Sequence, residues 1–193
     1  MKKTLLVGVA VVGVVLLLLV AWFASQYNRL VALQENAHSA WSQVETVLQR
    51  RYDLIPNLVN TVKGYAKHEK DVLEDVTRLR SQWGAATTVD EKVRAARQLE
   101  GGLGRLLLVA ERYPDLKANQ NFRDLQFELA GSENRIAVER QRYNDVARVY
   151  NTSVRQFPAS LVAGMCGFSA DAVYFEAKRE AKEAPKVDFG TEK

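Results

Sequence analysis

The chain has 193 residues and a formal net charge of +4, of which Lys2 and Lys3 contribute half. This even balance does not indicate nucleic-acid binding, for which a basic patch or stripe is typical. A single cysteine, Cys166, excludes an internal disulfide framework, and its apolar surroundings predict a buried, unreactive thiol. Few segments alternate between apolar and polar residues, so we predict an all-α fold.

Residues 5–24 form an uninterrupted apolar run, LLVGVAVVGVVLLLLVAWFA. A run of this length matches the roughly 20 residues that a helix needs to cross a hydrocarbon core about 30 Å thick. A cleaved signal peptide is the alternative, but its apolar region would be about 7 to 15 residues long and would end in small residues. Bulky Trp22 stands two places before Ala24. We therefore expect residues 1–26 to be a retained transmembrane anchor.

The charges that flank this segment predict its orientation. Lys2 and Lys3 precede it, whereas only Arg29 follows closely and is partly offset by Glu35. Positive charge is retained preferentially on the cytoplasmic side of a membrane. We therefore expect a single-pass protein of a bacterial inner (cell) membrane, with the N-terminus in the cytoplasm and the main domain in the periplasm or outside the cell.

The membrane helix is expected to continue into a stalk, because no glycine or proline stands between Val14 and Ile55. The apolar seam of the stalk is spaced by threes and fours. It consists of Leu30, Leu33, Ala37, Trp41, Val44 and Leu48. Pro56 removes a backbone donor and clashes with the preceding turn, so a kink or break is expected there. Asp53 is placed to cap the helix that follows.

Three further long helices are predicted after the proline. They cover residues 56–84, 88–113 and 116–157. Thr88 and Glu91 match a capping box at the start of the second, and glycines within 101–104 indicate a bend or a close helix crossing. About four long helices would then pack as an elongated antiparallel bundle over residues 27–175.

Polar positions in the seams and the C-terminal region leave alternatives open. Glu69, Glu133 and Arg140 could pair across helices, but we expect them to turn outward to solvent. The apolar residues of 159–175 are too short a run to cross a membrane. They either fold over one end of the bundle or contact the bilayer or a neighbouring subunit. Residues 176–193 mix opposite charges with alanine and proline, which predicts a flexible charged tail.

We find no candidate catalytic residues, no cofactor-binding residues and no metal ligands in the sequence. HEKDV, which begins at His68, starts like a zinc-protease motif but has Val72 in place of the second histidine. GGLG at 101–104 lacks the Lys-Ser/Thr pair of a phosphate loop. The carboxylates around Glu74 lack the Glu-x-x-His pattern of di-metal bundles and suggest a solvated face. We therefore expect a protein that is not an enzyme.

Three blocks of sequence resemble the LemA family of bacterial proteins. They are YNRLVALQENAHSAWSQVETVLQRRYDLIPNLVNTVKGYAKHE (27–69), YPDLKANQNFRDLQFELAGSENRIAVERQRYND (113–145) and YNTSVRQFP (150–158). The resemblance extends from the anchor to Phe175 and implies one N-terminal membrane helix followed by an elongated antiparallel helical domain. It implies no established enzymatic activity, and one branch looks like a component of magnetosome membrane formation. The resemblance does not fix the orientation, which rests on the flanking charges.

The residues within these blocks carry two further expectations. Aromatic residues are predicted to fill the seams: Trp41, Tyr52, Tyr65, Phe122, Tyr143 and Phe157. Polar residues are predicted either to hydrogen-bond across helices or to form a shared binding surface: Arg50, Arg51, Asp53, Asn57, Asn119, Asn121, Asn144 and Asn151.

Together these features predict a membrane-anchored helical scaffold or adaptor that forms homo-oligomers or recruits envelope proteins. Its first partner would be the lipid bilayer, through residues 5–24, and no nucleic-acid partner is expected. The alternative is a membrane-remodelling protein that acts directly on lipid through its amphipathic faces and the apolar surface of residues 159–175.

Overall fold

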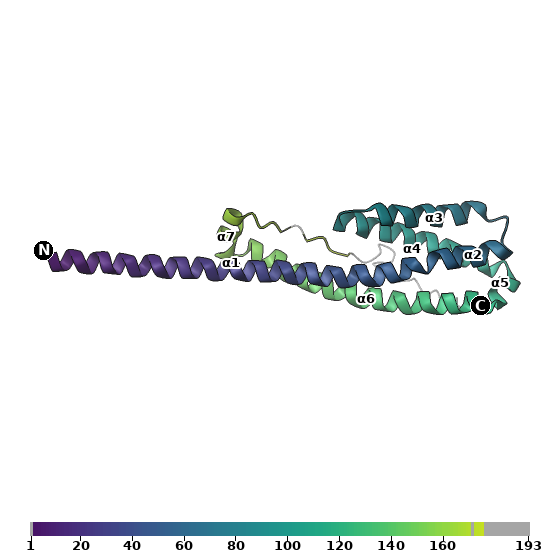
Figure 1. Ribbon diagram of the computed structural model, residues 1–193, viewed down its shortest axis with the longest axis horizontal. Helices are drawn as coiled ribbons and strands as arrows, with labels where there is room; N and C mark the ends of the chain where they lie inside the picture. The colour runs from purple at the N-terminus through teal and green to yellow at the C-terminus, as the bar shows by residue number, and fades with distance from the viewer. Residues whose placement is uncertain (1, 171, 176–193) are drawn as a thin grey trace, which may run out of the picture.

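The computed structural model describes residues 2–170 and 172–175, so the predicted tail at 176–193 lies outside the described residues. Its helices are α1 (Lys2–Asp53), α2 (Ile55–Tyr65), α3 (Lys70–Ala85), α4 (Val89–Glu111), α5 (Pro114–Ala118), α6 (Gln120–Arg155) and α7 (Ala159–Cys166). No strand occurs in this part of the chain. The predicted all-α fold is therefore confirmed, and Figure 1 shows it as a long rod that carries a bundle at one end.

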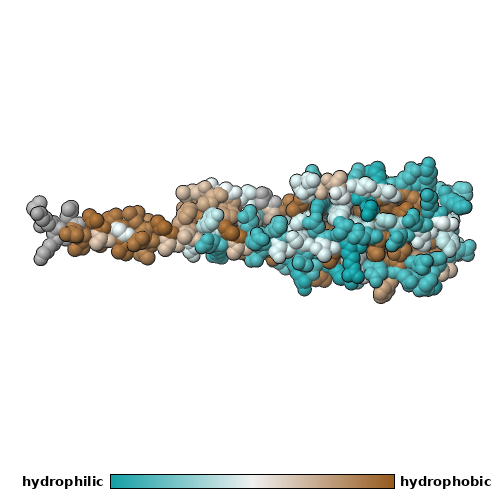
Figure 2. All heavy atoms as spheres, viewed as in Figure 1, coloured by the Kyte–Doolittle hydropathy of each residue, from teal (hydrophilic) through white to brown (hydrophobic). Residues whose placement is uncertain are grey.

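The rod is α1, a single helix of 52 residues that is about 78 Å long at 1.5 Å per residue. It passes from the apolar run into the bundle without a break, as the sequence predicts (Figure 1). Every side chain from residue 6 to residue 22 is exposed, and Figure 2 shows this stretch as a bare apolar rod. Of the described helices, this one is long and apolar enough to cross a membrane.

The break predicted at Pro56 is confirmed, because α1 ends at Asp53 and Pro56 lies in the first turn of α2. The predicted cap is wrong. Leu54 precedes α2 without a side-chain hydrogen bond, and Asp53 instead accepts a hydrogen bond of 2.7 Å from Gln49. Leu54 keeps a right-handed helical backbone, whereas a capping side chain needs an extended residue at that position. As a result α2 continues in the general direction of α1 (Figure 1).

The predicted single helix over 56–84 is also wrong, because residues 66–69 form a turn between α2 and α3. Ala66 leaves the helical region (φ −113°, ψ 61°) and is fully buried at this turn. After it, α3 folds back and pairs with α4, while α1 and α2 pair with α6. Figure 1 shows these long helices side by side in an elongated bundle, which confirms the predicted antiparallel arrangement.

Gly102 explains how closely α3 and α4 approach each other. A Cβ atom at this position would lie 2.8 Å from Cδ1 of Leu79 and 3.6 Å from Cγ2 of Val76. A larger residue would therefore force the side chain of Leu79 to move out of this contact. The close crossing predicted from the glycine cluster is confirmed at Gly102, whereas Gly101 and Gly104 face open space.

The predicted long last helix is divided at Asn119, where the short α5 ends and α6 begins. Oδ1 of Asn119 accepts a hydrogen bond of 3.0 Å from the backbone N–H of Phe122, which caps the start of α6. The 36 residues of α6 return along α1 for about 54 Å.

A second apolar cluster lies where α6 ends and α7 packs on α1. It consists of Leu30, Ala37, Tyr150, Val154, Val162 and Ala163. Through this cluster, α7 folds over the end of the bundle that faces the N-terminal segment (Figure 1). Three burial predictions fail. Cys166 is exposed, and so are Phe157 and Tyr65. Tyr65 and Cys166 are the last residues of α2 and α7, and Phe157 lies beyond the end of α6, so the helical spacing that predicts burial does not continue past them.

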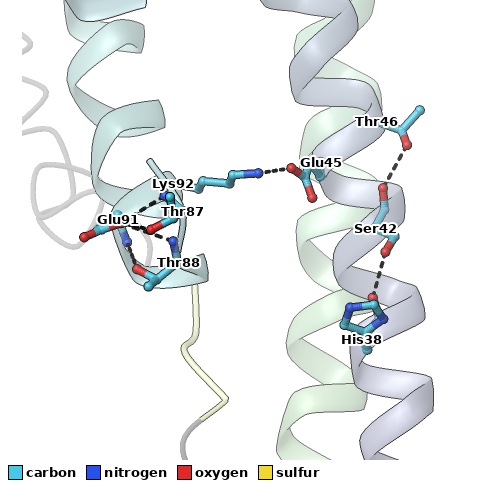
Figure 3. Close-up of polar contacts among 8 residues, drawn as sticks. All are labelled: His38, Ser42, Glu45, Thr46, Thr87, Thr88, Glu91 and Lys92. Carbon is cyan, nitrogen blue, oxygen red and sulfur yellow. Dashed lines mark hydrogen bonds and ion pairs between the residues drawn. The ribbon is translucent and has the colours of Figure 1, made fainter. Parts of the chain in front are cut away.

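The capping box at the start of α4 is confirmed (Figure 3). Thr88 Oγ1 accepts from the backbone N–H of Glu91 at 3.3 Å. Glu91 accepts in return from the backbone N–H groups of Thr87, at 3.0 Å, and Thr88, at 3.1 Å. Lys92, in the same turn, forms an ion pair with Glu45 of α1, which ties the start of α4 to the rod.

Replacing Trp41 tests the seam between α1 and α6. Trp41 is buried, so Trp41→Ala should lower the free energy of unfolding by about 3–5 kcal/mol. Urea denaturation of the full chain in detergent, followed by circular dichroism, measures this. The control Leu108→Ala alters an exposed side chain of α4 and should change stability by less than about 0.5 kcal/mol. Equal, small effects in both variants would contradict the buried position of Trp41.

The capping box also predicts a pH dependence. The backbone hydrogen bond from Thr87, followed by that from Thr88, lowers the pKa of Glu91 below its ordinary value. Because the pKa of Glu91 is lower in the folded than in the unfolded protein, its carboxylate stabilises the fold at pH values above the unfolded-state pKa. This contribution is lost as the pH falls through the folded-state pKa. Glu91→Gln should therefore destabilise the protein at pH 7, and the difference should shrink in acid. A difference that stays constant in denaturation curves from pH 7 to pH 3 would contradict this.

Candidate binding surfaces

The residues tested as chemical candidates are dispersed. His38 and His68 are both exposed, and the backbone carbonyl of His38 accepts a hydrogen bond from Ser42 within α1 (Figure 3). Two carboxylates of α3 form ion pairs: Glu74 with Lys70, and Asp75 with both Arg78 and Arg105. Within residues 2–170 and 172–175, no three His, Cys, Asp or Glu side chains form a group that could hold a metal ion.

Ion pairs cross the bundle at the seam positions expected to face solvent, so that expectation is wrong. Arg51 of α1 pairs with Glu133 of α6, and Arg140 of α6 lies 3.7 Å from Glu100 of α4. Glu69 pairs with Arg112 at 3.0 Å. The long arginine side chains can pack their apolar stems in the seam while their charged ends reach carboxylates on the neighbouring helix.

Tyr52 lies beside these ion pairs at the centre of the bundle. Its ring meets that of Trp83 edge-to-face, with 4.2 Å between centroids, and its backbone carbonyl accepts from Nε of Arg80 at 3.2 Å. Burial raises the pKa of Tyr52 above the ordinary value for a phenol, and the positive charges of Arg140 and Arg51 oppose that rise only in part. The phenol therefore stays neutral and serves packing between α1 and α3.

After α7 the chain reverses at Gly167, whose φ of +78° favours glycine. It then returns along α1 and α6 as a segment that we call the C-terminal strap (residues 167–170 and 172–175). Two asparagines of α6 hold it by paired hydrogen bonds to its backbone. Asn151 bonds to the N–H (3.2 Å) and C=O (2.9 Å) of Ala172. Asn144 bonds to the N–H (2.9 Å) and C=O (2.8 Å) of Phe175.

The spacing of these asparagines matches the strap. Seven residues of helix advance by about 10.5 Å, and three residues of extended chain, from Ala172 to Phe175, advance by about 10 Å. Each asparagine therefore replaces the hydrogen bonds that a neighbouring strand would supply. The polar motif residues Asn144 and Asn151 thus hydrogen-bond from α6 to the strap, whereas the alternatives left open by the sequence were hydrogen bonds across helices and a shared binding surface.

Phe175 anchors the end of the strap in the main core. Its ring stacks on Trp41 at 5.9 Å between centroids and meets Tyr143 edge-to-face at 5.9 Å. The guanidinium of Arg140 lies 5.0 Å from the same ring centroid. The strap therefore covers the α1–α6 seam and joins the two apolar clusters of the bundle.

The distal end of the bundle, farthest from the apolar run of α1, bears a groove of about 540 Å³ between α2 and α3. It is lined by Val59, Lys63, Lys67, Lys70, Leu73, Glu74, Thr77, Arg78 and Ser81. Apolar side chains thus lie beside four basic residues and one acidic residue. A segment with an apolar face and acidic flanks would complement this groove. The sequence pattern missed it, because it assigned α2 and α3 to one continuous helix.

Release of the strap is a direct test of its asparagine clamps. Asn144→Ala removes both side-chain groups that hydrogen-bond to the backbone N–H and C=O of Phe175. We therefore expect faster hydrogen exchange of the Phe175 amide in the full chain. Asn134→Ala, an exposed position on the same helix, is the matched control and should leave that exchange rate unchanged. Unaltered exchange at Phe175 in Asn144→Ala would show that the clamp does not hold the strap.

The chain is similar to proteins of one known family. The profile of the LemA family matches residues 40–189. Magnetosome protein MamQ 2 of Paramagnetospirillum magneticum is 27% identical in an alignment of length 185 that covers 82% of this chain and 68% of the relative. Magnetosome protein MamQ of Magnetospirillum gryphiswaldense is 26% identical in an alignment of length 179 that covers 79% of this chain and 65% of the relative. Protein LemA of Metamycoplasma hominis is 25% identical in an alignment of length 171 that covers 88% of this chain and 75% of the relative. These names do not describe enzymes, and the chain belongs to the LemA family.

Proposed function

We propose that this protein is a membrane-anchored, non-enzymatic scaffold or adaptor that self-associates or recruits proteins of the bacterial envelope. The continuity of α1 carries this proposal. Since α1 runs unbroken to Asp53 and α2 extends it to Tyr65, the distal tip lies roughly 60 Å beyond Ala24 at 1.5 Å per residue. Such a rod presents the bundle at a set height above a bilayer.

The proposed location is the inner (cell) membrane, with a single pass, a cytoplasmic N-terminus and a periplasmic or extracellular bundle. Lys2 and Lys3 before the apolar run support this orientation, because only Arg29 follows it closely. An exposed apolar surface as long as that of residues 6–22 is compatible with hydrocarbon and not with water.

The distal groove is the surface we assign to recruitment. Lys63 and Lys67 are exposed on its rim, and Val59 and Leu73 supply apolar contact area. A partner would insert an amphipathic segment with acidic flanks, and its affinity should fall with salt because the rim charges are exposed.

Self-association is assigned to the outer face of α6. Phe127, Val138 and Val149 are exposed and follow one another at intervals of eleven residues, which is close to three helical turns. They therefore lie on one side of α6, where a second copy of the chain could cover them.

Native mass spectrometry of the full-length protein extracted from its own membrane tests both surfaces. We expect masses above that of one chain. Phe127→Glu should reduce the homo-oligomer, and Lys63→Glu/Lys67→Glu should reduce complexes with other proteins, while the control Leu108→Glu should change neither. A lone monomer in the unaltered protein would contradict the proposal.

The second candidate is a protein that remodels the membrane directly. The observation in its favour is the exposed apolar side of α7, where Leu161 and Met165 face solvent. Reconstitution of the full chain into vesicles distinguishes the two functions. Tubes or constricted necks in electron micrographs would favour remodelling, whereas vesicles of unchanged shape would favour the scaffold.

A further inference from the structure

The position of α7 on the rod links it to the membrane boundary. Val162 and Ala163 of α7 share an apolar cluster with Leu30, and Phe23 of α1 packs against the same cluster. The ring of Phe168, just beyond α7, lies 5.7 Å from the ring of Tyr27. The contacts of α7 thus begin where the apolar run of α1 ends.

Simple geometry places these contacts in the headgroup layer. Tyr27, which meets the ring of Phe168, is three residues beyond Ala24 and therefore about 4.5 Å farther along the helix axis, whereas Leu30 is about 9 Å farther. The polar layer on each side of a bilayer is about 5–8 Å thick. If residues 5–24 fill the hydrocarbon, the contact at Tyr27 lies within that layer, the contact at Phe23 lies at its inner edge and Leu30 lies at its outer edge.

The exposed side of α7 has the chemistry of a lipid contact. Leu161 and Met165 are 57% and 78% exposed, and their spacing by four within α7 places them along one ridge of the helix. Residues 156–170 include no charged side chain. Figure 2 shows an apolar surface that continues from the bare rod to the neighbouring end of the bundle.

The orientation of α7 fits the same contact. Figure 1 shows α7 crossing α1 instead of running along it. Transmembrane helices tilt by only about 20° on average, so a helix that crosses α1 lies close to the plane of the bilayer. Interfacial helices adopt this orientation with their apolar side directed into the headgroup and acyl boundary.

We propose that α7 is a second membrane contact, in which Leu161 and Met165 insert into the interfacial layer of the same bilayer that α1 spans. The inference rests on the proposed membrane anchorage of α1. Exposed Arg29 and Arg155 lie at the same end of the bundle and suit lipid phosphates. Contact at two points would fix the tilt and rotation of the rod, which a single helix leaves free.

Spin labelling of the full-length protein in phosphatidylethanolamine/phosphatidylglycerol nanodiscs tests this proposal. In a Cys166→Ser background, one label at a time is attached at M165C, L161C, V15C or L108C. Power saturation compares collisions with oxygen, which concentrates in lipid, and with a water-soluble nickel chelate. We expect the depth parameter of M165C and L161C to shift toward that of V15C, in the span, and away from that of L108C, which reports an exposed site on α4.

The four sites separate the possible outcomes. Aqueous values at M165C and L161C, with lipid values at V15C, would overturn the proposal and leave the anchor intact. Aqueous values at V15C would instead overturn the anchor itself. Loss of both oxygen and nickel collisions at M165C, with spin–spin broadening, would show that a second copy covers α7 and would also overturn the proposal. In the supporting case, Leu161→Glu should return the M165C label to aqueous values.

Discussion

The continuous backbone hydrogen bonding of α1 is the constraint on which the rest of the structure depends. Within hydrocarbon every backbone N–H and C=O must be satisfied by the segment itself, so the apolar run must be helical. Because no break follows until Leu54, the same helix supplies the seam on which α6 packs. The direction of the bundle is therefore set by the helix that carries the proposed membrane span.

Polar contacts define how the other helices are placed along this rod. Apolar seams alone would allow one helix to shift by one turn along its neighbour. Such a shift would break the ion pairs Arg51–Glu133 and Glu100–Arg140 and would leave their charges unpaired, at a considerable cost in free energy. The clamps by Asn144 and Asn151 act in the same way on the strap. We infer that these groups contribute more to register than to total stability.

Helical periodicity predicts the fold class, the absence of glycine and proline between Val14 and Ile55 predicts the unbroken α1, and the Thr-x-x-Glu pattern predicts the capping box at Thr88. Periodicity could not predict contacts between distant segments. The turn at Ala66 was missed because its apolar residue fits a helical stripe as well as a buried turn. Periodicity also did not reveal the asparagine clamps, although two asparagines seven residues apart on one helix are a recognisable signal. The groove beside Lys63 depends on the turn at Ala66 and was missed with it.

The central claim is that α1 is one rigid rod through the membrane boundary, and the distance between two labels on it tests this most directly. In the full-length protein in nanodiscs, with Cys166→Ser, spin labels at L17C and Q43C stand on exposed positions either side of the boundary. They are 26 residues apart, so pulsed dipolar spectroscopy should give a narrow distribution near about 39 Å. A broad distribution or a much shorter mean would show a hinge between span and bundle and would contradict the account.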